Sequence, residues 1–317
     1  MRRALLVAAL LLCAPPALAQ DGPLRIMLGY PAGATSDLLA RLLADRLRAS
    51  LGRPVVVENR PGAGGQIANE MVKAAAPDGA TLLLTPVATM AIFPHSFAGR
   101  LSYDPLRDFA PVAHLSNFQL GFGVAAAVPA RTLADYVALV KKDARLGYDG
   151  SAAPGSLPHF FGVMFARTAG VELTHVPYKG TAQVMQAIAG GEISAISTVA
   201  ADIGTLVKAG KARLLAVSGE KRASAFPDVP TFRESGYDLV ALAWYALFAP
   251  AGTPGAVIEK QAAASIAAMR DPALRAKLGD MGLEPTGLGP RELGEILKAD
   301  YEKWGPVIRA SGFKPAD

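Results

Sequence analysis

The sequence predicts an α/β fold with two lobes, in which mainly parallel sheets are flanked by helices and a cleft separates the lobes. Two observations lead to this fold class. Short apolar runs that are typical of strands alternate with amphipathic helical patterns along most of the chain, as in βαβ units. The length of 317 residues is that of two domains at roughly 150 residues each, so each lobe can bury its own core.

The first 19 residues have the pattern of a secretory signal peptide. Met1-Arg2-Arg3 is a short basic segment, the stretch from Ala4 to Ala14 is apolar, and Ala17-Leu18-Ala19 fits the small-residue rule for cleavage. The apolar stretch is shorter than the roughly 18 residues that a membrane span needs. We therefore expect cleavage after Ala19 and export to the periplasm.

The composition of the remaining chain excludes several classes of protein. Removal of residues 1–19 takes away two arginines, no acidic residue and the single cysteine, so the formal charge falls from +5 to +3. Without cysteine, the mature chain has neither disulfides nor a thiolate metal cluster. A charge of +3, with no basic run interleaved with aromatic residues, does not indicate nucleic-acid binding. The apolar fraction of 51% excludes a disordered chain.

The first strands and helices follow one another in regular alternation. The helices are recognised by apolar residues at helical spacing, which is most regular between Asp37 and Leu47, and the strands by short apolar runs. The expected strands are 24–28, 54–58 and 81–85, and the expected helices are 37–47 and 66–75.

The alternation resumes near residue 122 and ends in a helical tail. Each of the three tail helices begins near a proline, which favours the first helical turn. In this second stretch the expected strands are 122–128, 172–176, 193–198 and 213–217, and the expected helices are 133–142, 156–168, 182–189 and 203–209. The expected tail helices are 254–269, 272–281 and 290–310.

The second lobe is expected to be inserted into the first. The chain is expected to cross between the lobes near Gly121–Val124 and again near Gly219–Asp228. Two crossings without a Gly/Ser-rich linker suit a hinge, which needs only a few residues at strand ends. Lobe one then comprises residues 20–122 and 223–317, and lobe two comprises residues 123–222.

Four strand-to-helix connections are rich in small residues and are the candidate binding loops. In parallel α/β sheets, ligands bind beyond the carboxyl ends of the strands, where helix N-termini offer free N–H groups to an anion. An ordinary capped turn would contain similar residues, so the binding and the structural interpretation both stay open. The four loops are Tyr30–Asp37, Asn59–Gly65, Gly150–His159 and Val176–Thr181.

Motifs of enzymes and metal sites do not occur in the sequence. There is no G-x-S-x-G or H-E-x-x-H motif, the four histidines lack metal-ligand spacing, and Asn59–Gly65 lacks the spacing of a dinucleotide site. We therefore expect no catalysis, no cofactor and no metal. A serine hydrolase that uses Ser151 or Ser156 with His159 stays open, because residues distant in sequence can assemble a catalytic site.

A series of short motifs occurs in the order found in one known family. The motifs are Tyr30–Asp37, Asn59–Gly65, Pro77–Leu83, Tyr103–Val112, Gly150–His159, His175–Gly180, Phe226–Thr231, Trp244 and Ala249–Pro254. With them the mature chain resembles the Bug/TctC family, the extracytoplasmic solute receptors of tripartite tricarboxylate transporters. Each motif is weak alone, and their number and order carry the resemblance.

The resemblance implies a two-lobe periplasmic binding fold, type II-like or Venus flytrap, that closes on a small carboxylated solute. A di- or tricarboxylate, an amino acid or an aromatic acid would fit. The implied partners are membrane permease subunits, and the receptor is expected to be a monomer. The expected ligand-binding residues are Tyr30, Pro31, Ala32, Gly33, Ala34, Thr35, Asp37, Thr85, Ala88 and Thr89 of lobe one, and Ser151, Gly155, Ser156, His159, Tyr178, Lys179, Ser197, Thr198 and Asp202 of lobe two.

Two positions depart from the family pattern and bear on the solute. Ala34 stands where the family usually has a second glycine, and a methyl group there disfavours a positive φ. Ser194 stands where the family commonly has an acidic residue. The sequence also leaves open a ligand-sensing subunit that reports to a membrane kinase, because such a subunit would share the binding site.

Overall fold

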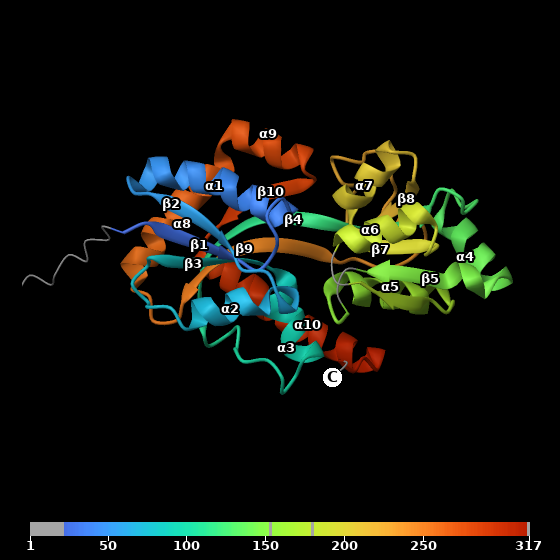
Figure 1. Ribbon diagram of the computed structural model, residues 1–317, viewed down its shortest axis with the longest axis horizontal. Helices are drawn as coiled ribbons and strands as arrows, with labels where there is room; N and C mark the ends of the chain where they lie inside the picture. The colour runs from blue at the N-terminus through green and yellow to red at the C-terminus, as the bar shows by residue number, and fades with distance from the viewer. Residues whose placement is uncertain (1–21, 152–153, 179–180, 316–317) are drawn as a thin grey trace, which may run out of the picture.

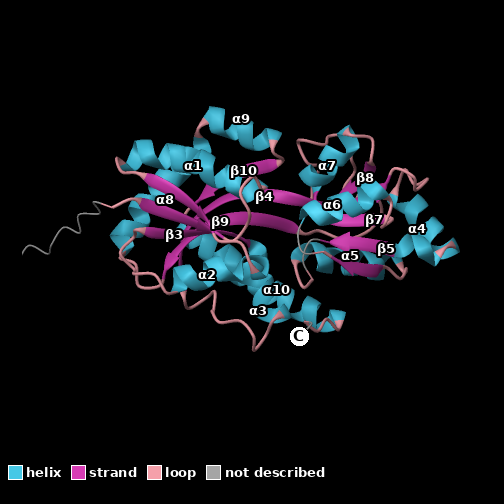
Figure 2. Ribbon diagram, viewed as in Figure 1, coloured by secondary structure: helices cyan, strands magenta, loops and turns pink. Residues whose placement is uncertain are grey.

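A computed structural model shows an elongated α/β molecule in which two parts lie side by side (Figure 1). The structure describes residues 22–151, 154–178 and 181–315. The expected signal peptide and Lys179 lie outside the described residues. Helices flank the sheet on both sides in each part, which confirms the expected α/β class (Figure 2). Within the described ranges, no helix is long and apolar enough to cross a membrane.

The elements alternate along the chain much as the sequence predicts. The first part begins with β1 (Leu24–Leu28), α1 (Thr35–Leu51), β2 (Val55–Asn59), α2 (Gln66–Lys73), β3 (Thr81–Pro86), the π-helical turn η2 (Ala88–Ile92), α3 (Phe93–Ser96) and β4 (Phe109–Ala125). The second part contains α4 (Leu133–Lys142), β5 (Tyr148–Ser151), α5 (Leu157–Ala169), β6 (Thr174–Pro177), α6 (Thr181–Gly190), β7 (Ala195–Val199), α7 (Ala200–Lys208) and β8 (Ala212–Val217). The chain then returns to the first part with β9 (Leu242–Pro250), α8 (Gly255–Arg270), α9 (Pro272–Asp280), β10 (Leu283–Leu288) and α10 (Pro290–Ser311).

Parallel pairing is confined to the outer strands, and the central strands pair antiparallel. β1 pairs parallel with β2 and β3, and β5 pairs parallel with β6 and β7. β9 and β10 run antiparallel to their neighbours, as do the pairs of β4. The strand order is β2-β1-β3-β9-β4-β7-β5-β6, with β8 and β10 also paired to β4. The sheet is therefore mixed, and less parallel than the sequence patterns indicate.

β4 carries the sheet from one part into the other. Up to Gln119 it pairs with β9 and β10, and from Leu120 onward it pairs with β7 and β8. The sequence patterns predict only the end of this strand, because Pro111, His114 and Ser116 interrupt the apolar run in its first portion. They also miss β5, β9 and β10.

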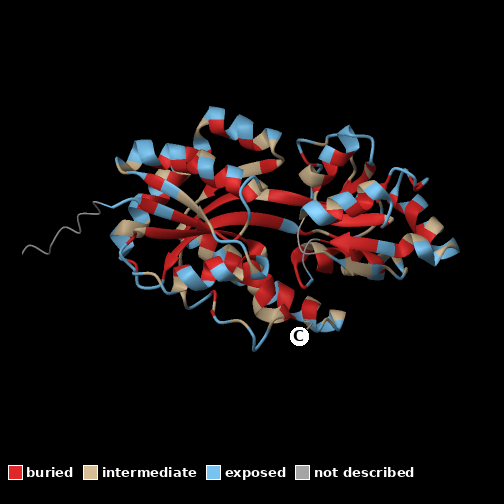
Figure 3. Ribbon diagram, in the orientation of Figure 1, coloured by how far each residue is buried: buried red, intermediate tan, exposed pale blue. Residues whose placement is uncertain are grey.

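The core of each part lies between its strands and the inner faces of its helices (Figure 3). In the first part, α1, α8 and α9 lie on one face of the sheet, and α2, α3 and α10 lie on the other (Figure 1). Leu39, Leu43 and Leu47 recur at helical spacing in α1 and are fully buried, so hydrophobic burial fixes which face of this helix meets the sheet.

The segment between β8 and β9 packs on the second part for most of its length. The Phe232 ring lies 4.9 Å from the Phe161 ring and 5.3 Å from the Phe165 ring, both of α5. Thr231 also forms a β-bridge with Val217. We therefore propose that the second crossing lies near residues 239–242, beyond the 219–228 stretch expected from the sequence.

Gln119 joins β4 to the segment that follows β8 by side-chain hydrogen bonds. Its Oε1 accepts the Gly219 N–H at 2.9 Å, and its Nε2 donates to the Lys221 carbonyl at 3.1 Å. Gln119→Ala leaves the buried Gly219 N–H without its partner, so we expect the free energy of unfolding to fall by about 1–3 kcal/mol. Urea unfolding measures this loss. A change below about 0.3 kcal/mol would contradict the assigned role.

Candidate functional site

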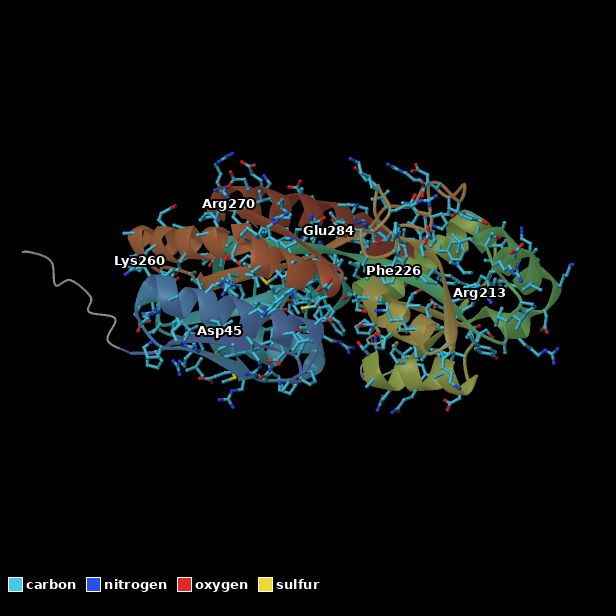
Figure 4. The ribbon with its side chains drawn as sticks, turned by 90° about the horizontal axis from the view of Figure 1, so that it is seen from above. Asp45, Arg213, Phe226, Lys260, Arg270 and Glu284 are labelled. Carbon is cyan, nitrogen blue, oxygen red and sulfur yellow. The ribbon has the colours of Figure 1, made fainter. Side chains whose placement is uncertain are left out.

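A cavity of about 630 Å³ lies where the two parts meet. The first part contributes Thr35 and Leu38 of α1 together with the end of α9 and the turn to β10, and the second part contributes residues along α7 up to its end at Lys208. Phe226, which also lines the cavity, is labelled at the junction of the two parts in Figure 4. The full lining is Thr35, Leu38, Ala201, Asp202, Gly204, Thr205, Lys208, Ser224, Ala225, Phe226, Ala276, Gly279, Asp280, Met281 and Gly282.

Asp37 fixes the loop that leads into α1 by hydrogen bonds. The two carboxylate oxygens of Asp37 accept hydrogen bonds from the Gly33 N–H at 2.9 Å, Arg41 Nε at 3.0 Å and Asn59 Nδ2 at 2.9 Å. Burial alone would raise the pKa of Asp37, but these bonds outweigh burial and lower it below its usual range. The Asp37 carboxylate is thus hydrogen-bonded within the protein and fixes the shape of the loop. Pro31, Ala32 and Gly33 are exposed.

Ala34 fits this loop without strain. Its φ of −67° is extended backbone, whereas Gly33 has a φ of +84°, which favours glycine. Ala34 is the N-cap of α1, and no side chain caps the helix there. The positive φ that would exclude an alanine is therefore at Gly33, and the departure at Ala34 leaves the turn intact.

Tyr30 and Thr89 lie together beside the glycines that precede α2. The Tyr30 hydroxyl donates to the Gly64 carbonyl at 3.0 Å, and a Cβ at Gly65 would lie 3.3 Å from both Tyr30 and Thr89. The Thr85 and Thr89 hydroxyls bond each other at 2.6 Å and are buried. Both hydroxyls are therefore engaged within the fold, and Ala88 beside them is partly buried.

Asp202 of the second part lies near Tyr245 of β9, which belongs to the first part. Burial raises the pKa of Asp202 to about 6. Burial also raises the pKa of Tyr245, and the nearby Tyr30 and Asp202 raise it further. The Tyr245 ring stacks on Phe118 at 4.6 Å, which fixes it in the first part. Asp202, Tyr245 and Tyr30 therefore share one region, although they come from three distant segments of the chain.

A second cluster lies beside the loop before α5 and contains His159 of α5 and His175 of β6. Ser151 Oγ lies 2.8 Å from His175 Nε2, and His159 Nδ1 accepts the Gly155 N–H at 3.0 Å. The two imidazole rings are 3.9 Å apart. Burial lowers the pKa of His159 to about 4, and burial together with the neighbouring His159 lowers that of His175 to about 3. Both rings are neutral at physiological pH.

This cluster corrects the serine–histidine pair considered from the sequence. Ser151 meets His175, not His159, because β5 and β6 are adjacent parallel strands with Gly150 opposite Val176. Ser151 is fully buried. Ser156 Oγ is also buried and has no hydrogen-bond partner among the described residues. His159 bonds the backbone of its own loop, so neither serine is its partner.

The remaining candidate residues of the second part lie under or beside this cluster. Ser197 Oγ donates to Asp149 Oδ2 at 3.0 Å, and the Tyr178 N–H donates to the Ser151 carbonyl at 3.1 Å. Thr198 is buried in β7. Ser194 directly precedes β7, and its Oγ donates to the Arg145 carbonyl at 3.4 Å.

Of the candidate residues that the structure describes, only Thr35 and Asp202 line the cavity between the parts. Tyr30 and Thr89 form one cluster, and Ser151, Gly155 and His159 form another. Sequence reasoning missed Tyr245, because it lies on an unpredicted strand, and missed His175 as the partner of Ser151. The rise of apolar and aromatic residues across Leu242–Phe248 is the signal that would have revealed β9.

The fold and the cavity between its parts define a two-lobed α/β protein of the periplasmic binding type. A family model described as "Tripartite tricarboxylate transporter family receptor" matches residues 39–313. The chain belongs to this family, as its motifs led us to expect.

Relatives and solved structures agree with this assignment. The chain is 34% identical to the "UPF0065 protein in gbd 5'region" of Cupriavidus necator, over 98% of this chain and 95% of that one. It is 32% identical to "Protein BugT" of Bordetella pertussis, over 92% and 90%. Its structure is similar to that of MatC from Rhodopseudomonas palustris with bound malate, at 28% identity and a TM-score of 0.82 over 91% and 99% of the chains. R. palustris Rpa4515 with adipate gives 28% identity and a TM-score of 0.88 over 94% and 100%.

Proposed function

We propose that this chain is a periplasmic solute-binding protein that captures a small carboxylated solute between its two parts for a tripartite tricarboxylate transporter. Its family and the malate and adipate bound by two similar structures support the solute class. One observation carries the location of the site: Thr35 of the first part and Asp202 of the second line the same cavity. A solute there would hold the two parts together.

The loop before α1 supplies the groups that an anion needs. α1 is 17 residues long and has no side-chain cap at Ala34, so the N–H groups of Thr35 and Ser36 and the Thr35 hydroxyl are the donors for a carboxylate, while the Asp37 N–H bonds the Ala34 carbonyl. Micromolar affinity corresponds to about 8 kcal/mol. A few charge-assisted hydrogen bonds of roughly 1.5–3 kcal/mol each, with some apolar contact, are enough for it.

We propose that the other candidate residues support this site or act within the closed form. Asp37 holds the first loop, Thr85, Ala88 and Thr89 support Tyr30, and Ser197 lies beneath the second part's loops. Gly155, Ser156, His159 and Tyr178 lie in or beside the second-part loops that would approach the solute on closure, and Thr198 lies in β7 behind them. Lys179, which lies outside the described residues, stays a prediction.

We further propose that the receptor performs no catalysis, is exported by residues 1–19 and works as a monomer with membrane permease subunits. Full burial of Ser151 supports the first point, because a nucleophile must reach its substrate. A serine-directed fluorophosphonate probe tests it, and stoichiometric labelling that Ser151→Ala abolishes would establish the hydrolase instead. Capture of permease rather than kinase subunits from membranes of the native host tests the partner.

A titration of refolded protein tests the solute class. The chain is unfolded in guanidinium chloride to release any bound solute, refolded, and titrated calorimetrically with malate, adipate, citrate, glutamate and benzoate. Adipamide is the matched neutral control for adipate. We expect at least one carboxylate to bind with micromolar affinity while adipamide produces no heat. If adipamide binds as tightly as the acids, or none of the acids binds, the proposed solute class is wrong.

A further inference from the structure

We infer that Asp202 makes the receptor selective for carboxylates that also carry an ammonium group, so that an amino acid binds better than the matching acid without nitrogen. This inference rests on the proposed function, because it takes the cavity between the two parts as the solute site. It concerns one further property of that site, namely the charge of the solute beside its carboxylate.

Asp202 differs from Asp37, the buried acid at the start of α1, in having no hydrogen-bond partner within the described residues. Asp37 has three hydrogen bonds within its loop. Asp202 is partly buried and lines the cavity, and its carboxyl group makes no hydrogen bond or ion pair within the described residues. A carboxylate that is partly removed from water without a partner is unfavourable, and a ligand that supplies an ammonium group would satisfy it.

The surroundings of Asp202 favour a cation at this point. Asp280 at the end of α9 lines the same cavity, and Lys208 of α7 is the one basic side chain among the lining residues. Tyr245 of the first part lies near Asp202, and Tyr30 lies near Tyr245; burial raises the pKa of both phenols, so they are neutral. The lining therefore holds two carboxylates against one ammonium group. A second carboxylate of the solute placed here would be repelled.

The donors and the acid lie on opposite walls. Thr35 and the first turn of α1 belong to the first part, and Asp202 belongs to the second. An α-amino acid carries its carboxylate and its ammonium group on the same carbon atom, so one group can meet each wall at the same time. Binding would then draw Asp202 toward the first part, which couples recognition of the ammonium group to closure.

The pH dependence of solute affinity shows whether Asp202 binds an ammonium group as a carboxylate or donates to a second carboxylate as a carboxylic acid. Burial raises the pKa of Asp202 to about 6, so the group is mainly ionised at pH 7.5 and mainly protonated at pH 5. An ionised Asp202 that binds ammonium loses its attraction as the pH falls, so affinity for an amino acid should decrease between pH 7.5 and pH 5. A protonated Asp202 that donated to a second carboxylate would give the reverse trend.

The experiment uses pairs of solutes that differ in one ammonium group. Refolded full chain is titrated with aspartate and succinate, and with glutamate and glutarate, at pH 7.5 and pH 5. The variants are Asp202→Asn and, as the control on an exposed surface away from the cavity lining, Asp228→Asn. We expect the amino acid of a pair to bind at least 10-fold more tightly, Asp202→Asn to remove this preference, and Asp228→Asn to change each affinity less than 3-fold.

Each other outcome overturns a defined claim. If the acids without nitrogen bind at least as tightly as their amino acids, or Asp202→Asn weakens both members equally, the inference is wrong while the proposed function stands. If affinity for the amino acids rises from pH 7.5 to pH 5, Asp202 acts as a hydrogen-bond donor and the inference is wrong. If none of these solutes, malate, adipate, citrate or benzoate binds, the proposed function fails and the inference fails with it.

Discussion

Gly29→Ala is expected to lower the free energy of unfolding by about 3 kcal/mol and to abolish solute binding. A Cβ at position 29 would lie 2.4 Å from the Gly65 Cα and 2.7 Å from the Gly65 carbonyl oxygen. Both are backbone atoms, so no side chain can rotate away. The end of β1 would have to separate from the start of α2, and this movement would displace Tyr30 from its bond to the Gly64 carbonyl.

Gly255→Ala is the matched control for this prediction. Gly255 begins α8, and a Cβ there would have no atom within 4 Å. Urea unfolding of both variants, followed by the calorimetric titration, measures the two effects. A Gly29→Ala protein that is as stable as Gly255→Ala and binds solute normally would show that β1 and α2 do not depend on this close approach.

Asp149→Asn is expected to stabilise the chain above pH 7 by up to about 4 kcal/mol relative to the natural protein. Asp149 is buried in β5, its Oδ2 accepts from Ser197, and its Oδ1 has no hydrogen-bond partner among the described residues. Burial raises the pKa of Asp149 to about 7, against the Ser197 hydrogen bonds that lower it. An amide of the same shape has no charge to bury at high pH.

The sign of this effect follows from the proton that Asp149 holds in the folded state. Between its ordinary pKa of 3.8 and a folded pKa of about 7, folded protein binds one proton more than unfolded protein. The contribution of Asp149 to stability is therefore highest at low pH and is lost as the pH rises to about 7. His114, His159 and His175, whose pKa values burial lowers, act in the opposite direction.

A difference between variants separates Asp149 from the histidines. The free energy of unfolding is measured in urea from pH 4 to pH 8 for the natural chain, Asp149→Asn and the exposed control Asp228→Asn. We expect the advantage of Asp149→Asn to grow from pH 4 to pH 7 and then level off, while the control follows the natural chain. An advantage that does not vary with pH would mean that Asp149 is ionised in the folded state.

Local patterns in the sequence predict most of the helices and outer strands, because a helix or strand that buries one face shows it in its spacing. The predicted strand at 24–28 and helix at 133–142 coincide with β1 and α4. β4 is different, since His114 and Gln119 are polar yet buried. Their partners, such as Thr286 beside His114 and Gly219 beside Gln119, are far away in sequence, so no local pattern reveals why they are tolerated.

In the candidate site, too, local sequence patterns identify the loops but not the contacts between residues far apart in sequence. Small residues identify the loop at Tyr30–Asp37, because a backbone that turns at Gly33 needs a positive φ. The hydrogen bonds of Asp37 with Asn59 and of Ser151 with His175 depend on which strands and helices are neighbours. These contacts arise from the topology, and spacing along the chain does not encode them.

Hydrogen exchange with and without bound solute tests the central claim most directly, namely that one solute is held between the two parts. The carboxylate with the highest affinity in the titration is used, and peptides from α1 and α7 are followed together with peptides from α4 and α8 as references. We predict slower exchange in the first turns of both α1 and α7, and no change in α4 or in the outer turns of α8. Protection of only one of the two walls, or of neither, would contradict a site between the parts.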